Sequence, residues 1–116
     1  MAEDPSRNDA PITPVEISVF IQAGRYVFNT DDSRPIYSFD NDRREESNCE
    51  AVCAMTWQPV TAPSTATMVG DWKAIERTDK SKQWAYKGKP VYTYARDRPG
   101  QITGDGVDGL WHVVKP

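Results

Sequence analysis

The alternation of apolar and polar residues predicts a chain of short β-strands. Apolar and polar side chains alternate at first in residues 15–21, and after a turn at 23–24 residues 25–28 form a second strand-like run. This alternation is typical of strands that bury one face and expose the other. A further tight hairpin is predicted at Lys87-Gly88, because glycine accepts the positive φ that such turns require.

Other segments lack this alternation. Residues 1–14 contain three prolines and several polar residues without periodicity, which predicts a disordered lead-in. Residues 59–66, rich in Pro, Thr and Ala, are typical of a loop. Only the segment 47–55 favours a helix, of about two turns, with Ser47 or Asn48 as its N-cap.

Two segments of nine residues are copies of one motif. Residues 34–42 read Arg-Pro-Ile-Tyr-Ser-Phe-Asp-Asn-Asp, and residues 89–97 read Lys-Pro-Val-Tyr-Thr-Tyr-Ala-Arg-Asp. All positions except the two before the final Asp agree in chemical type, which indicates a duplicated unit. We therefore predict a single domain, residues 15–116, with two tandem units at about 23–60 and 70–116.

The similarity between the two units extends beyond the motif. Upstream, residues 30–33 have a counterpart in residues 78–81. Downstream, residues 52–57 align loosely with residues 107–111. The fold class that follows is mainly β, a small single domain of two duplicated β units with one short helix around Cys49 to Cys53.

Within each motif the strand period of two separates two kinds of side chain. One face receives aromatic rings, namely Tyr37, Phe39, Tyr92 and Tyr94. The opposite face receives Ile, Val, Ser and Thr, so a sheet with one aromatic face is expected. The closing residues Asp42 and Asp97 are predicted to cap turns with their side chains.

Composition and charge narrow the classes of partner. The net charge is −3 and the pI about 5.1, with acidic and basic residues interspersed along the chain. No basic stripe is apparent, so nucleic acid is not expected as a partner. No apolar run approaches the ~20 residues of a transmembrane helix, and the segment after Met1 lacks the apolar core of a signal peptide.

The motif resembles the secreted-repeat lipoproteins of unknown function, which carry a Tyr-x-aromatic-x-x-Asp repeat. Other positions fit in the right order, and the resemblance covers the chain from about residue 23 onward. The residues that carry it include Tyr37, Phe39, Asp42, Ser47, Cys49, Cys53, Trp57, Pro59, Trp84, Tyr92, Tyr94, Asp97 and Trp111.

The resemblance implies an exported protein, periplasmic or extracellular and often lipid-anchored, with no established activity to carry over. The lipid-attachment cysteine and the export signal are missing from this sequence, which argues against a lipid anchor here. The motif residues are expected to be either structural or ligand-facing.

The two cysteines, Cys49 and Cys53, favour a local disulfide if the protein is exported. On a regular helix their separation does not suit a bridge, so an irregular helix end is required. The alternative is a metal or redox site for copper or zinc, in which both thiolates act with Met55, Met68 or His112.

The remaining polar clusters predict little chemistry. Three carboxylates among glycines in residues 97–109 suit either a Ca²⁺ site or ordinary turns, and turns are favoured there and at residues 40–42. No hydrolase motif is present, and a single histidine limits acid–base catalysis, so an enzyme is not expected. The four tryptophans could line a ligand groove but are predicted to fill the core.

The function expected from the sequence is that of a non-enzymatic, exported or envelope-associated binding or structural module. Its partner would be an unidentified ligand or envelope component, and no cofactor is expected. The alternative is a metal-binding or redox protein that uses Cys49 and Cys53.

Overall fold

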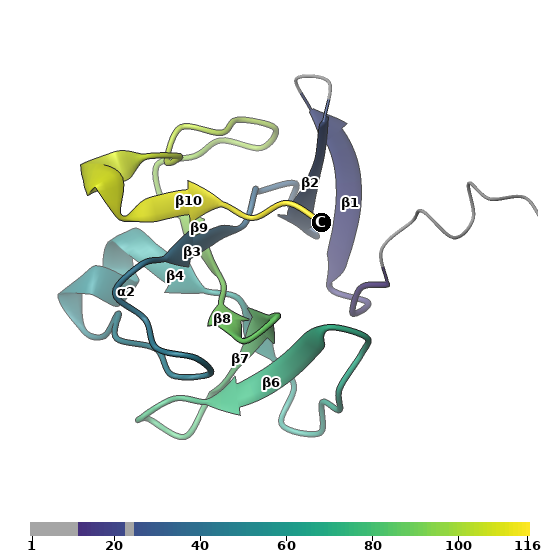
Figure 1. The fold of residues 1–116 in the computed structure, drawn as a ribbon, viewed down its shortest axis with the longest axis vertical. Helices are drawn as coiled ribbons and strands as arrows, with labels where there is room; N and C mark the ends of the chain where they lie inside the picture. Colours follow the sequence, from purple (N-terminus) through teal and green to yellow (C-terminus); the bar gives the residue numbers. More distant parts are fainter. Residues whose placement is uncertain (1–11, 23–24) are drawn as a thin grey trace, which may run out of the picture.

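The computed structural model describes residues 12–22 and 25–116 (Figure 1). Short strands dominate the described chain, with one short α-helix and one 3-10 helix, which confirms the predicted mainly β class. In chain order the elements are β1 (Ile17–Gln22), β2 (Arg25–Thr30), β3 (Tyr37–Phe39), α2 (Val52–Thr56), β4 (Trp57–Pro59), β5 (Thr61–Ala62), β6 (Trp72–Glu76), β7 (Lys82–Tyr86), β8 (Lys89–Pro90), β9 (Tyr92–Tyr94), η1 (Val107–Gly109) and β10 (Trp111–Val113).

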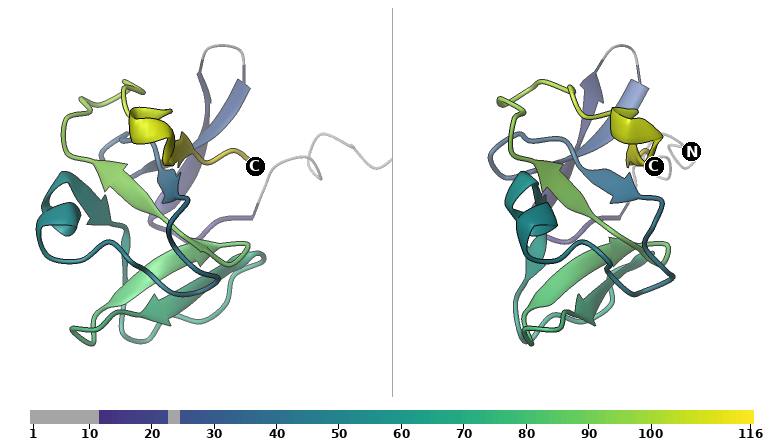
Figure 2. Two further views of the ribbon diagram at one scale, coloured as in Figure 1. Left: turned by 60° about the vertical axis from the view of Figure 1, so that its left-hand side comes forward. Right: turned by 90° about the vertical axis from the view of Figure 1, so that its left-hand side faces the viewer.

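The described strands form three antiparallel sheets. The central sheet has the order β10-β3-β9-β4, and the two motif strands β3 and β9 lie side by side in it, with Tyr37 opposite Tyr92. The second sheet is the β1-β2 hairpin, and the third has the order β5-β7-β6 with β8 added to β7. Figure 2 shows the β1–β2 and β6–β7 hairpins at opposite ends of the domain.

The two halves of the chain exchange strands in the central sheet. Strand β10, from the second half, pairs with β3 from the first, and β4, from the first half, pairs with β9 from the second. The pairs match in position, because Trp111 lies opposite Phe39 just as Trp57 lies opposite Tyr94. Each half therefore supplies a strand that completes the other half, and the central sheet requires both.

Loop contacts repeat the same exchange. Glu45 donates its backbone N–H to the carbonyl of Gly88 over 2.7 Å, and Gly100 donates to the carbonyl of Ser33 over 2.9 Å. All four residues have positive φ. This backbone conformation suits glycine, and in the second half both positions are glycine.

The alternation of the motif strands separates two cores, as the period of two predicts. Ile36 and Val91 are fully buried in a cluster with Phe28, Trp72 and Trp84. The motif tyrosines belong to a second cluster on the other face, with Val27, Cys49, Trp57, Trp111 and Val113. Ser38 and Thr93 on the first face are also buried, so the central strands are covered on both sides.

The strands predicted at 15–21 and 25–28 are confirmed as the β1–β2 hairpin, and so is the tight turn between β7 and β8. Lys87 and Gly88 both have positive φ, of 51° and 85°, and Ala85 pairs with Pro90 across the turn. The predicted turn at 23–24 lies outside the described residues. So does most of the predicted lead-in, residues 1–11, whereas Pro14 is buried against the domain and accepts a hydrogen bond from Ile17 N.

Three details of the sequence interpretation are wrong. The helix starts at Val52, without a side-chain cap, because Ala51 before it has a φ of 54° that breaks a regular start further upstream. Residues 59–66 are not entirely a loop, since β5 pairs with β7. The turn at 78–81 joins β6 to β7, whereas 30–33 joins β2 to β3, so these two segments are not counterparts.

Within the described residues, no helix is both long and apolar enough to cross a bilayer.

Candidate functional site

The tyrosine and aspartate residues that the two motif copies share form a crossed pair of hydrogen bonds between the copies. Tyr37 Oη donates to Asp97 Oδ2 over 2.6 Å, and Tyr92 Oη donates to Asp42 Oδ2 over 2.7 Å. The first tyrosine of each motif, Tyr37 or Tyr92, is therefore hydrogen-bonded to the closing aspartate of the other motif. This arrangement links the two halves of the chain at two equivalent points.

The Tyr37–Asp97 pair is deeply buried. Asp97 is 2% exposed and Tyr37 is fully buried. The second carboxylate oxygen of Asp97 accepts from the backbone N–H of Thr103 over 2.8 Å and from the Thr103 hydroxyl. The Tyr37 hydroxyl in turn accepts from Gly104 N over 3.0 Å, and Arg34 donates to the Asp97 carbonyl over 2.8 Å. The Tyr37 hydroxyl and both carboxylate oxygens of Asp97 thus each have a hydrogen-bond partner within the protein.

The Tyr92–Asp42 pair has the same design but is more open. Asp42 Oδ1 accepts from Asn48 N over 2.6 Å, which matches the bond from Thr103 N to Asp97. The Tyr92 hydroxyl also shares a hydrogen bond of 2.6 Å with Ser47 Oγ. Asp42 is half-buried, in contrast to Asp97. The prediction that each closing aspartate caps a turn agrees with these bonds.

Burial sets the protonation of these groups. Burial, and next the hydrogen bond to Asp97, raise the pKa of the Tyr37 phenol well above its ordinary value. Burial and the hydrogen bond to Asp42 likewise raise the pKa of Tyr92. Burial also raises the pKa of Asp42, against the lowering effect of its hydrogen bonds from Asn48 and Tyr92. The phenols of Tyr37 and Tyr92 therefore stay protonated and donate in these bonds.

Four aromatic rings form a continuous stack beside the crossed pairs. The centroid separations along it are 4.1 Å from Phe39 to Trp111, 3.9 Å from Trp111 to Trp57 and 4.1 Å from Trp57 to Tyr94. The planes of the two tryptophans differ by only 3°. Edge-on rings complete it, with Tyr37 against Trp57 at 5.3 Å and its counterpart Tyr92 against Trp111 at 5.2 Å.

A close backbone approach supports this stack at Gly104. A Cβ atom at this position would lie 2.7 Å from Trp57 Cη2 and 3.0 Å from Tyr94 Cδ2. These separations are too short for any side chain, so glycine is required for the ring stack to close. The corresponding position in the first half, one residue after Asn48, is Cys49.

Cys49 forms a disulfide with Cys53, with Cα atoms 5.2 Å apart. The bridge is possible because Cys49 lies before the helix and Cys53 lies in its first turn, with Ala51 at a positive φ of 54° between them. The geometry agrees with the irregular helix end that the spacing requires. Cys49 is fully buried in the aromatic cluster, so the bridge fastens the exposed helix to the core.

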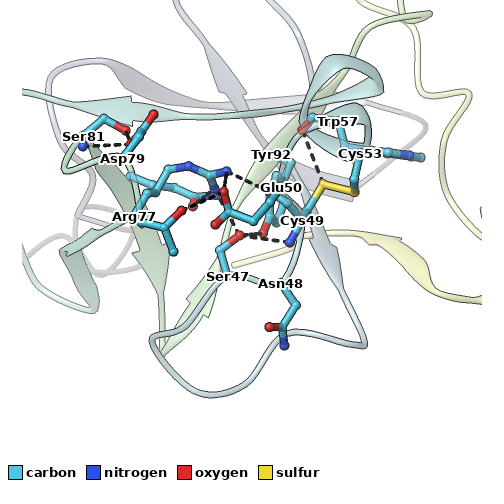
Figure 3. A network of polar contacts seen from close by, with 12 residues as sticks. Ser47, Asn48, Cys49, Glu50, Cys53, Trp57, Arg77, Asp79, Ser81 and Tyr92 are labelled. Carbon is cyan, nitrogen blue, oxygen red and sulfur yellow. Dashed lines mark hydrogen bonds and ion pairs between the residues drawn. A yellow bond between two sulfur atoms is a disulfide. The ribbon is translucent and has the colours of Figure 1, made fainter.

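Arg77 is a buried residue that the sequence did not indicate. Its guanidinium donates to the Cys49 carbonyl over 2.8 Å, to Gln83 Oε1 over 2.9 Å and to Ser47 Oγ over 3.0 Å (Figure 3). Glu50 forms an ion pair with it at 3.4 Å. Arg77 thereby ties the disulfide loop to strand β7. No local pattern marks this arginine, because all its partners are brought to it by the fold.

The residues considered as metal ligands do not lie together in one site. Cys49 and Cys53 are bridged, the side chains of Met55 and Met68 are 71% and 69% exposed, and His112 instead pairs with Asp40 at 2.8 Å. Within residues 12–22 and 25–116, no three His, Cys, Asp or Glu side chains lie close enough to share an ion.

The carboxylates of residues 97–109 also serve separate purposes. Asp97 belongs to the buried pair, and Asp105 accepts from Val113 N over 2.9 Å. Asp108 is exposed in η1. These contacts favour the turn interpretation over a Ca²⁺ site.

All four tryptophans lie in the core. The exposed fractions of Trp57, Trp72, Trp84 and Trp111 are at most 5%. These rings are therefore largely covered by other side chains, although Trp84 borders a shallow hollow of about 210 Å³ beside Pro14 and Val69.

Comparison with known proteins gives one family match. Residues 73–115 match the family described as "secreted repeat of unknown function". No curated protein and no solved structure matches the chain. The matched segment contains the second motif, with Tyr92, Tyr94 and Asp97, and ends beyond Trp111. The match agrees with the resemblance seen in the sequence over residues 73–115.

Proposed function

We propose that this domain is a non-enzymatic module that works outside the cytoplasm, in the periplasm or extracellularly, as a binding or structural unit. The observation that carries the proposal is the crossed pairing of the two motifs. The tyrosine hydroxyls and aspartate carboxylates of the repeat are the groups most suited to catalysis. They are instead hydrogen-bonded to one another and to neighbouring backbone within the domain.

Two features of the motif residues support a non-catalytic role. Asp97 is almost fully buried and already accepts hydrogen bonds from Tyr37 and Thr103. A general acid or base must reach a substrate atom within hydrogen-bond distance, which a covered carboxylate with all partners in place does not do. The motif residues therefore hold the two halves of the domain together. Ligand binding is then left to the outer surface of the domain.

Two other features support export. The Cys49–Cys53 disulfide is of a kind that persists in oxidising compartments and is rare in the cytosol. The family matched by residues 73–115 is described as secreted. A metal or redox role for the cysteines gains no support, since the thiols are bridged and no further ligand lies beside them in the described chain.

The test is the location and redox state of the protein in its native cells. Cells are fractionated, free thiols are alkylated under denaturing conditions without reductant, and the mass of the protein is measured in each fraction. We expect the protein outside the cytoplasm, with Cys49 and Cys53 unalkylated. Protein that remains in the cytoplasm with both cysteines alkylated would contradict the proposal.

A further inference from the structure

Two adjoining hollows form one groove on the surface of the domain. The first, of about 260 Å³, is lined on its basic side by Arg43, Arg44 and Lys89. The second, of about 270 Å³, has Lys115 and His112 in its wall. Both hollows share Ser38, Asp40, Lys87 and Lys89. We call this continuous surface the basic groove, defined by Arg43, Arg44, Lys87, Lys89, His112 and Lys115.

The groove concentrates positive charge on a chain that is acidic overall. Its Lys and Arg side chains number five against Asp40 and Asp42, a net of +3, while the whole chain carries −3. The five cations are exposed, and none forms an ion pair with another described residue. Acidic and basic residues are interspersed along the sequence. On this surface, however, the fold gathers cations from three segments that are distant in the sequence.

The two acidic residues of the groove already have partners. Asp40 pairs with His112 at 2.8 Å. Asp42 accepts from Tyr92 Oη and Asn48 N. The lysines and arginines of the groove have no acidic partner among the described residues, although Lys87 Nζ lies 5.3 Å from the centroid of the Tyr86 ring. An anionic ligand suits them, because cations that lack an acidic partner in a concave surface focus a positive field.

The domain contains an internal comparison for this groove. A hollow of about 440 Å³ in the other half lies along β4, where Gln58 and Thr93 occupy the positions that correspond to His112 and Ser38. Its charged side chains are Glu16, Asp31, Asp32 and Arg34, and Arg34 is paired with Asp32 at 3.0 Å. The same strand geometry therefore carries a net acidic surface there, so the fold alone does not demand a basic groove.

We propose that the basic groove binds a segment of a linear acidic polysaccharide, with uronate carboxylates on the Lys and Arg side chains. This inference rests on the binding role proposed above and names its ligand class. The two joined hollows suit an extended ligand with repeated charges better than one compact anion. Phe39, a partly exposed aromatic residue, also lines the first hollow, and an aromatic side chain suits the apolar face of a sugar.

The acidic character of the rest of the chain does not prevent this binding. At physiological ionic strength the Debye length is about 8 Å, so charges far from the groove are largely screened from a ligand within it. Contacts to exposed lysines are themselves sensitive to salt. Binding through this groove therefore weakens as ionic strength rises.

The experiment is calorimetric titration of the intact, oxidised protein with a hexamer of α-1,4-linked galacturonate. The groove variant is Lys87→Gln, Lys89→Gln and Lys115→Gln. The control variant is Lys80→Gln, Arg96→Gln and Arg98→Gln, which changes the net charge equally at exposed positions outside the groove. Lys80 and Lys87 both have positive φ, so each variant replaces one residue whose backbone conformation is unfavourable for side chains other than glycine. Far-ultraviolet circular dichroism and the intact disulfide establish that both variants are folded.

We expect the groove variant to bind the uronate hexamer about tenfold more weakly, as three exposed ionic contacts allow, and the control variant to bind like the original protein. Equal loss in both variants would overturn the groove as the site. Hexaglutamate that binds as tightly as the uronate would overturn the carbohydrate assignment, whereas neutral maltohexaose should not bind. Absence of uronate binding by the original protein would refute this inference and leave the export result of the proposed function unaffected.

Discussion

The sharpest test of the packing account is the replacement Tyr37→Phe. This change removes one oxygen atom and keeps the buried ring in its edge-on contact with Trp57. The lost hydroxyl donates to Asp97 over 2.6 Å and accepts from Gly104 N over 3.0 Å. The replacement therefore removes one charge-assisted and one neutral hydrogen bond from the interior, without opening a large cavity.

The magnitude follows from burial. A hydrogen bond to a charged group contributes about 1.5–3 kcal/mol, and a buried donor that loses its acceptor costs about 1–3 kcal/mol. Asp97 is 2% exposed, so water does not replace the lost bond, but its contacts to Thr103 remain. We expect Tyr37→Phe to lower the free energy of unfolding by about 2–4 kcal/mol, a large share of the stability of a small domain.

Urea unfolding measures this change through the midpoint concentration at constant m-value. Tyr26→Phe serves as the control, because the Tyr26 side chain is 53% exposed and its change should stay within about 0.5 kcal/mol. Equal midpoints for Tyr37→Phe and Tyr26→Phe would refute the buried-bond argument.

Three further predictions follow from the same contacts. First, Tyr37 and Tyr92 should remain un-ionised in the native protein above pH 10, the region where phenols of an unfolded chain lose their protons. Because their folded pKa values are raised, the unfolded state binds fewer protons in this range, and the free energy of unfolding falls as pH rises through it. Ultraviolet difference titration should show a deficit of phenolate in native against denatured protein, and no deficit would contradict the assigned burial. Second, replacing Cys49 and Cys53 by serine should lower stability by about 2 kcal/mol in urea unfolding, because the bridge closes only a short loop. A change above that of Tyr37→Phe would mean that the bridge holds the whole fold. Third, Ala51→Gly should raise stability by about 0.5–1 kcal/mol, since Ala51 has a φ of 54° that glycine adopts without strain. A lower melting temperature for this variant would show that the positive φ at Ala51 costs nothing there.

The sequence predicts the local features of this domain well, because they depend on neighbours along the chain. The period of two separates Tyr37 and Tyr92 from Ile36 and Val91, and the structure puts these pairs in different clusters. The turn at Lys87-Gly88 follows from the backbone freedom of glycine. The position of the helix was less predictable, because nothing in the sequence around Ala51 indicates its positive φ.

Features that depend on the exchange between halves could not be read from the sequence. Nothing local indicates that Tyr37 bonds Asp97, since 60 residues separate them. The same applies to the burial of Arg77 among Ser47, Cys49 and Gln83. The basic groove was missed for a related reason, because its cations come from segments that alternate with acidic residues along the chain.

The central claim of this account is that each motif tyrosine bonds the aspartate of the other motif. A double-mutant cycle in urea unfolding tests it most directly, with Tyr37→Phe combined either with Asp97→Asn or with Asp42→Asn. We predict a coupling energy of at least about 1 kcal/mol between Tyr37 and Asp97, and one within about 0.5 kcal/mol of zero between Tyr37 and Asp42. Coupling of Tyr37 to Asp42, with none to Asp97, would show that each motif closes on itself and would contradict the crossed arrangement.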